Sequence, residues 1–93
     1  MRHLDHAEAY IETAPDSSLA ILDSIDTATL RSDNHRARHA LLTTYARYRN
    51  YIVETDDSLI STAVDYYKST SDERHFMQSL YSRATILQYA NEH

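Results

Sequence analysis

The phrase Asp16-Ser17-Ser18-Leu19 returns about 40 residues later as Asp56-Asp57-Ser58-Leu59, in a chain of 93 residues that contains no glycine. Asp and Ser side chains commonly cap the first turn of a helix, and a Leu shortly afterwards begins an apolar stripe. A helix-opening phrase with a period of roughly 40 residues is typical of proteins built from stacked helix pairs. The repeated phrase therefore predicts an all-α fold of stacked antiparallel helix hairpins.

Apolar residues recur at steps of three and four in five segments, which polar clusters and one proline separate. This spacing places apolar side chains on one face of a helix. Pro15 prevents the helix before it from continuing, and either Asp16 or Ser17 is expected to cap the next helix. Leu30, in the polar connector that follows, is expected to plug the core. The predicted helices span residues 3–13, 16–26, 34–52, 57–69 and 72–91.

The three later helices carry the longest apolar stripes, and we expect these stripes to form the core. Their members are Ala37, Leu41, Tyr45, Tyr48 and Ile52, then Leu59, Ile60, Ala63, Val64 and Tyr67, then Met77, Leu80, Tyr81, Ala84 and Leu87. An offset of about 39 residues aligns Leu41 with Leu80, which predicts equivalent roles for the third and fifth helices. Because no partner helix follows the fifth, its unpaired apolar face could support a homodimer. Without glycine, Asn34, Asn50 and polar clusters are expected at left-handed helix ends.

Charge and composition exclude several classes of function. The chain has 25% charged and 42% hydrophobic residues, which is typical of a globular domain rather than a disordered tail. Its formal net charge of -5 argues against direct nucleic-acid binding, which requires clustered Lys and Arg. There is no cysteine for a disulfide, and no apolar run of the kind found in signal peptides or membrane spans. We expect this segment to contact neither nucleic acid nor membrane, and its compartment stays undetermined.

Two histidine pairs have spacings that could suggest a metal site. His35 and His39 lie four residues apart, the spacing of helical zinc ligands, but no Glu stands between them and two neighbouring arginines disfavour a cation. His3 and His6 lie three residues apart near a terminus. We interpret all four as residues of solvated helix faces and predict no metal site.

Asp56 and Asp57 could be imagined as a catalytic carboxylate pair, but they immediately precede a strong apolar stripe. Helix capping explains that position, and it contributes about 0.5–2 kcal/mol to stability. No serine lies in a nucleophile-elbow phrase, and a glycine-rich phosphate loop cannot form without glycine. The sequence therefore predicts no catalytic residue, no cofactor and no enzyme activity.

Two parts of the chain resemble tetratricopeptide-repeat proteins of the Bacteroidetes type. The run Pro15–Asp26, which reads PDSSLAILDSID, resembles the opening of these proteins. Asn50–Ile52, followed by Asp56–Ile60 and Ala63–Tyr67, resembles their continuation, whereas Arg83-Ala84 stands where the family signature has a Leu-Gly step. The resemblance implies a right-handed α-solenoid fragment of about five helices, a single domain over residues 1–93 that belongs to a longer array. Such proteins are often exported and sometimes tethered in a membrane ahead of a cytoplasmic DNA-binding region.

The resemblance also implies a binding surface, because the first helices of successive pairs line the concave face of such arrays. If the helices over 34–52 and 72–91 are those first helices, the side chains beside their packing stripes are His39, Arg49, Asn50, Gln78, Tyr81, Gln88 and Tyr89. Tyrosine combines a large apolar ring with a polar tip and is frequent at binding hot spots. We expect these residues to contact a protein or peptide partner.

Three hypotheses about function follow. The first is a non-enzymatic protein-interaction or scaffold module of a helical-repeat protein. The second is the N-terminal sensor region of a membrane-tethered transcriptional regulator. The third is a self-contained small helical bundle that binds a ligand or a metal.

Overall fold

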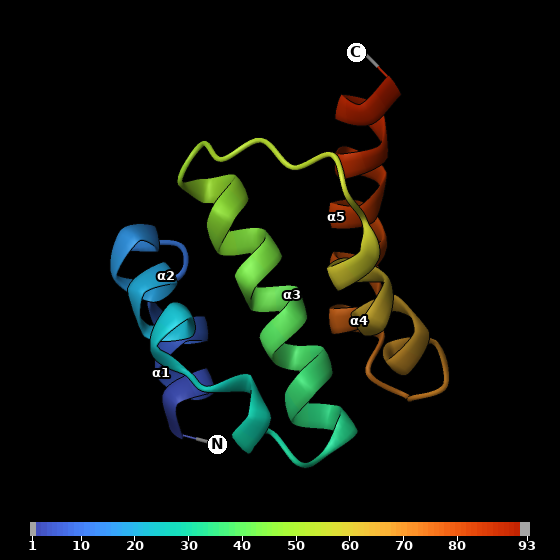
Figure 1. The fold of residues 1–93 in the computed structure, drawn as a ribbon. Coiled ribbons are helices and arrows are strands. Elements are labelled where there is room, and N and C mark those ends of the chain that lie inside the picture. The colour runs from blue at the N-terminus through green and yellow to red at the C-terminus, as the bar shows by residue number, and fades with distance from the viewer. Residues whose placement is uncertain (1, 92–93) are drawn as a thin grey trace.

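The computed structural model describes residues 2–91, and every regular element in this range is helical. The elements are α1 (Arg2–Tyr10), α2 (Pro15–Ser24), the short 3-10 helix η1 (Thr27–Thr29), α3 (Asp33–Arg49), α4 (Ser58–Lys68) and α5 (Glu73–Asn91). Successive α-helices run in opposite directions, so that α1, α3 and α5 point the same way (Figure 1). The predicted all-α fold is confirmed for the described residues, although the first and third helices end earlier than expected, at Tyr10 and Arg49.

α3 lies in the centre of the molecule and packs against each of the other α-helices of the described chain (Figure 1). One core cluster joins α1 and its following turn to α2 and α3, and it consists of Leu4, Ala7, Ile11, Leu22, Leu42 and Ala46. A second cluster joins α3, α4 and α5, and it consists of Ala37, Ala40, Leu41, Ile60, Ala63, Tyr67 and Ile86. Leu30 is buried, as predicted for the connector before α3. Both halves of the core therefore depend on α3.

Alanine and threonine, rather than the predicted tyrosines, make up most of the buried residues of α3. The buried alanines and threonines are Ala37, Ala40, Thr43, Thr44 and Ala46. Tyr45 is only half-buried, Tyr48 is 46% exposed, and Ile52 lies beyond the end of the helix. The prediction that Tyr48 and Ile52 belong to the core is wrong, because a helix packed on several sides buries most of its circumference and leaves little room for large rings.

α5 packs through a different face from the predicted one. Its buried residues are Ser79 and Ile86, and Phe76 packs against the cluster of α3 and α4. The residues expected in its packing stripe are exposed: Met77, Leu80, Tyr81, Ala84 and Leu87. The physical reason is that α5, the last described helix, packs mainly on α3 and α4, and no helix within residues 2–91 covers these positions. Leu41 is buried and Leu80 is exposed, so the predicted equivalence of these two positions is wrong.

The start of α2 does not use a side-chain cap. The helix begins at Pro15, and the N-cap residue Ala14 offers no side-chain hydrogen bond. The expected capping by Asp16 or Ser17 is therefore wrong. Proline explains the difference, because a proline at the first helical position lacks one of the N–H groups that a cap would otherwise satisfy.

The two copies of the repeated phrase occupy different positions in their helices. Ser18 is the fourth residue of α2, is fully buried, and donates its hydroxyl hydrogen to the carbonyl oxygen of Ala7 at 2.7 Å. Ser58 is the first residue of α4 and is exposed. Asp56 accepts a hydrogen bond from the Ser58 backbone N–H at 2.9 Å, so the expected capping role is confirmed for this residue, whereas the N-cap Asp57 makes no side-chain cap.

α3 ends in a Schellman motif whose left-handed residue is Tyr51, not the expected asparagine. Tyr51 has φ 62° and Asn50 has φ -95°. The Ile52 N–H donates to the Arg47 carbonyl at 2.9 Å, and the Tyr51 N–H donates to the Tyr48 carbonyl at 3.1 Å. This pattern normally places glycine in the left-handed position, because a Cβ there is crowded by the following carbonyl. Because the chain contains no glycine, Tyr51 occupies the left-handed position, and its backbone is strained there.

Candidate binding groove

A groove runs along the side of the molecule that is formed by α1, α3 and α5. Its broad part has a volume of about 500 Å³ and is lined by Glu8, Ile11, Glu12, Leu41, Leu42, Tyr45, Arg74, Met77, Gln78, Tyr81 and Ser82. Met77 is 63% exposed and Tyr81 is 71% exposed. Large side chains that face solvent beside a concave surface are typical of interaction sites. We call this surface the α1–α3–α5 groove.

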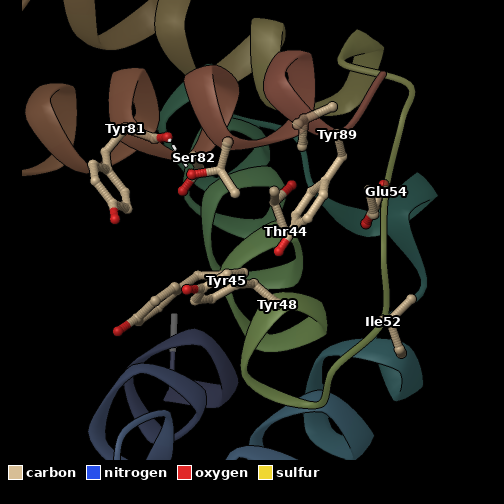
Figure 2. Close-up of a pocket in the computed structure, with 10 residues that line it drawn as sticks. Thr44, Tyr45, Tyr48, Ile52, Glu54, Tyr81, Ser82 and Tyr89 are labelled. Atoms are coloured by element: carbon tan, nitrogen blue, oxygen red, sulfur yellow. Dashed lines mark hydrogen bonds between the residues drawn. The ribbon is translucent and has the colours of Figure 1, made fainter. Parts of the chain in front are cut away.

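A smaller pocket of about 30 Å³ lies between α3 and α5, and four tyrosines line it. Tyr45 and Tyr48 come from α3, and Tyr81 and Tyr89 come from α5. Figure 2 shows the rings of Tyr45, Tyr48 and Tyr89 in the space between the two helices. The other lining residues are Thr44, Ile52, Glu54, Ser82, Thr85 and Ile86. This tyrosine pocket adjoins the broad part, because Tyr45, Tyr81 and Ser82 line both.

Hydrogen bonds and ring packing fix the floor of the tyrosine pocket. The Tyr45 hydroxyl donates to Oε1 of Glu12 at 2.5 Å, and this bond, together with burial, raises the pKa of Tyr45. The Tyr45 and Tyr48 rings stack with centroids 6.4 Å apart and planes 13° from parallel. Arg47 Nη1 donates to Oε1 of Glu54 at 3.0 Å, which holds the connector after α3 against the helix. The pocket is therefore formed before any ligand arrives.

A network of charged side chains joins α1, α3 and α5 beside the broad part of the groove. Oε1 of Glu8 accepts from Arg38 Nε at 3.0 Å and from Nη2 at 2.7 Å, while Oε2 accepts from Arg74 Nη2 at 2.9 Å. The imidazole of His75 lies between Oε2 of Glu8 at 2.9 Å and Oδ2 of Asp72 at 2.5 Å. Arg38 Nη1 also pairs with Asp5 at 2.7 Å. We call these residues the Glu8 network.

The environment of the Glu8 network keeps its carboxyl groups ionised. Partial burial alone would raise the pKa of Glu8, but hydrogen bonds from His75 and Arg38 outweigh it, and the pKa is lowered from its ordinary 4.5. The hydrogen bond from His75 is the main cause that lowers the pKa of Asp72 from 3.8. Tyr67 stacks on the His75 ring at 5.2 Å, and burial raises the pKa of Tyr67 to about 12. At neutral pH the network therefore contains charged carboxylates beside a neutral phenol.

Three of the residues predicted to contact a partner lie in the groove. Gln78 and Tyr81 line its broad part, and Tyr81 and Tyr89 line the tyrosine pocket. All three come from α5, whose exposed face was predicted to be core. The structure brings them together with α3 residues that the prediction placed in the core, most clearly Tyr48.

The other four predicted contact residues lie elsewhere. His39 is buried, and its Nε2 lies 3.2 Å from the Leu22 carbonyl oxygen, so this side chain does not line the groove. Arg49 Nη2 donates to the Glu12 carbonyl at 3.0 Å, and Asn50 Nδ2 donates to the carbonyls of Pro15 and Ala46, so both tie the end of α3 to its surroundings. Gln88 is exposed on α5 outside the groove.

The histidine and aspartate pairs considered from the sequence do not form a metal centre in the described part of the chain. No group of three or more His, Cys, Asp or Glu side chains between residues 2 and 91 is arranged to hold a metal ion. Nε2 of His39 already contacts the Leu22 carbonyl oxygen, and His3 and His6 are exposed on α1. None of the helices in this range combines the length and apolar character that spanning a bilayer demands.

Sequence reasoning missed the Glu8 network and two further carboxylates that line the groove or its tyrosine pocket, Glu12 and Glu54. The residues of the network come from α1, α3 and the start of α5, and Glu8 and His75 are 67 positions apart. One signal was available: Asp72 precedes His75 by three residues at a helix start, which is the spacing of an N-terminal cap. Their pairing with Glu8 depends on how α1 and α5 approach, which local patterns do not specify.

No protein-family model, curated protein or solved structure matches this chain. The tetratricopeptide-like, right-handed solenoid arrangement therefore stays a prediction, as does membership of a longer array.

Proposed function

We propose that this chain is a protein-interaction module whose α1–α3–α5 groove binds an extended segment of a partner protein. The observation that carries the proposal is the position of Tyr81 and Met77. These two side chains are largely exposed and line a groove with a volume of about 500 Å³. Aromatic and methionine side chains serve as anchors because they bury a large area, and methionine adapts its shape to the partner.

The order of helix packing supports a tetratricopeptide-like role for this groove. α2 packs against both α1 and α3, and α4 packs against both α3 and α5. The pairs α1–α3 and α3–α5 also pack directly against each other. Such contacts are typical of stacked hairpins, in which the first helices of each pair share one face. We propose that the groove is that shared face.

Binding accounts for the polar groups better than catalysis does. The carboxylates of Glu8 and Asp72 and both ring nitrogens of His75 are engaged with one another or with arginines. A general acid or base must instead reach a substrate proton. We therefore propose a role for the Glu8 network in holding the walls of the groove, with no turnover.

Selection from a displayed library of random peptides tests this function. The purified chain is expected to enrich peptides whose binding is lost in Tyr81→Glu and Met77→Glu, because both changes place a charge in the groove. Tyr10→Glu is the matched control, since Tyr10 is an aromatic residue that is 51% exposed and does not line the groove. Enrichment of peptides that bind all four proteins equally, or of none, would contradict the proposal.

The exposed stripe of α5 favours a second candidate, self-association. Leu80 and Leu87 are 36% and 42% exposed on the side of α5 that faces no other described helix. A second copy packed on this stripe would bury these leucines. Light scattering at increasing protein concentration, with Leu87→Glu as the disrupting variant, distinguishes a dimer from a monomer.

A further inference from the structure

We propose that the tyrosine pocket receives the primary ammonium group of a lysine side chain of the partner. This inference rests on the proposed function and specifies the chemistry of one contact within it. Tyr45, Tyr48, Tyr81 and Tyr89 line a space between α3 and α5. The face of an aromatic ring carries negative potential and attracts a cation within about 6 Å.

The charges that line the tyrosine pocket select the same class of ligand. Glu54 is its one ionisable acid, and no Lys, Arg or His is among the lining residues. Arg47 engages Oε1 of Glu54, and the described part of the chain supplies no donor to Oε2. A ligand cation can therefore bind that oxygen without displacing Arg47.

The helix geometry adds to this negative potential. Tyr48 lies in the last turn of α3 and Tyr89 in the last turn of α5, so the pocket adjoins the carboxyl ends of two helices that run in the same direction (Figure 1). The peptide dipoles of each helix place partial negative charge at such an end, which favours cations. Arg47 and Arg49 already lie in the last turn of α3, but neither lines the pocket, and their side chains bond Glu54 and the Glu12 carbonyl.

The size of the pocket and the Oε2 atom of Glu54 favour a small cation that carries N–H donors. A cavity needs about 10–15 Å³ to hold one water molecule, so a volume of about 30 Å³ accepts a small group. An ammonium with its adjoining methylene fits, and unlike a trimethylammonium it has N–H groups that can donate to Oε2 of Glu54. The aliphatic stem of a lysine can lie along Tyr81 and Met77, which line the broad part of the groove.

Three small amphiphiles test the inference by NMR titration of the tyrosine ring signals. n-Butylammonium is expected to give saturable shifts at the pocket tyrosines, and butan-1-ol and butyltrimethylammonium to bind at least about fivefold more weakly. Equal binding of the alcohol would make the pocket a simple apolar site and overturn the inference. Equal or tighter binding of the trimethylammonium, or no saturable shift with n-butylammonium, would also overturn it.

Variants locate the binding site. Glu54→Gln and Tyr89→Leu are each expected to weaken n-butylammonium binding about fivefold, and Tyr10→Leu, outside the pocket, to leave it unchanged. Thermal melting of each variant confirms that it is folded. Because Glu54→Gln also loosens Arg47, Tyr89→Leu keeps the test valid if the first variant unfolds. Unchanged binding in folded Tyr89→Leu would contradict the proposed location.

The displayed peptides separate this inference from the proposed function. If the enriched peptides require one lysine, and replacing it by norleucine lowers their affinity in the parent but not in Glu54→Gln, both stand. If the peptides bind through Tyr81 but tolerate norleucine equally well, the interaction module stands and the lysine site is wrong.

Discussion

Oε2 of Glu8 accepts a hydrogen bond from Nε2 of His75 at 2.9 Å, which joins α1 to α5 across 67 positions of sequence. The same carboxylate accepts two bonds from Arg38 of α3 through its other oxygen. One side chain of α1 thus connects the three helices that line the groove. A carboxylate in this position orients the groove walls through charge-assisted bonds, which are stronger than neutral ones.

Glu8→Gln is expected to lower the free energy of unfolding by about 2 kcal/mol. The amide keeps the shape but removes the charge that Arg38, Arg74 and His75 share, and the Glu8 side chain is only 19% exposed. Asp33→Asn is the matched control: Asp33 also pairs with an arginine, Arg36, but is 81% exposed, so about 0.5 kcal/mol or less is expected. Urea denaturation measures both, and equal losses would show that the network contributes no more than a surface ion pair.

The carboxylates of the network predict a loss of stability in acid. The pKa values of Glu8 and Asp72 are lowered on folding from 4.5 and 3.8. A group whose pKa is lower in the folded state stabilises that state fully above its unfolded pKa, and this contribution is lost as the pH falls through the folded value. The free energy of unfolding should therefore decline from about pH 5 downwards, and more shallowly in Glu8→Gln. Parallel curves for the two proteins between pH 5 and pH 3 would contradict the assignment to Glu8.

The fold class and the approximate helix positions could be predicted because they depend on local patterns. Capping, proline and the three-to-four spacing act within a few residues, and they placed α4 within one residue at either end. Which face of each helix is buried depends instead on the number of neighbours. α3 has neighbours on several sides and buries alanine and threonine, while α5 lacks one and exposes Leu80.

The groove could be predicted only in part for the same reason. Tyr81 and Tyr89 were expected to face a partner, and they do line the groove. His39 was expected beside them, but the carbonyl of Leu22 at the end of α2 engages its ring. That contact depends on the crossing of α2 and α3, for which the sequence holds no local signal.

Tyr51→Gly is expected to raise the free energy of unfolding by about 0.5–1 kcal/mol. Tyr51 has φ 62°, where a residue with a Cβ is disfavoured by about 1–2 kcal/mol, and its side chain is 94% exposed, so little packing is lost. The larger freedom of glycine in the unfolded chain offsets part of the gain. Tyr51→Ala is the control, because it removes the ring but keeps the Cβ. Equal stabilisation by both substitutions would mean that the aromatic ring, not the backbone, is the source of strain.

The serines of the repeated phrase provide a direct comparison of two positions that the sequence makes look equivalent. Ser18 is buried and its hydroxyl binds the Ala7 carbonyl at 2.7 Å, which joins α2 to α1. The exposed Ser58 binds Oδ1 of Asp56 at 2.6 Å, two residues away. Removing a buried hydrogen bond costs about 1–2 kcal/mol when a partner is left unsatisfied, whereas water replaces an exposed one.

Ser18→Ala should therefore lower the free energy of unfolding by about 1–2 kcal/mol, and Ser58→Ala by less than about 0.5 kcal/mol. Urea denaturation measures the difference, with one m-value fitted to the parent and both variants. Equal effects would mean that the two phrases act alike as helix starts, which is what a strict repeat requires. Unequal effects would show that the chain uses one short phrase for two physical purposes, a helix start in α4 and an interhelical bond in α2.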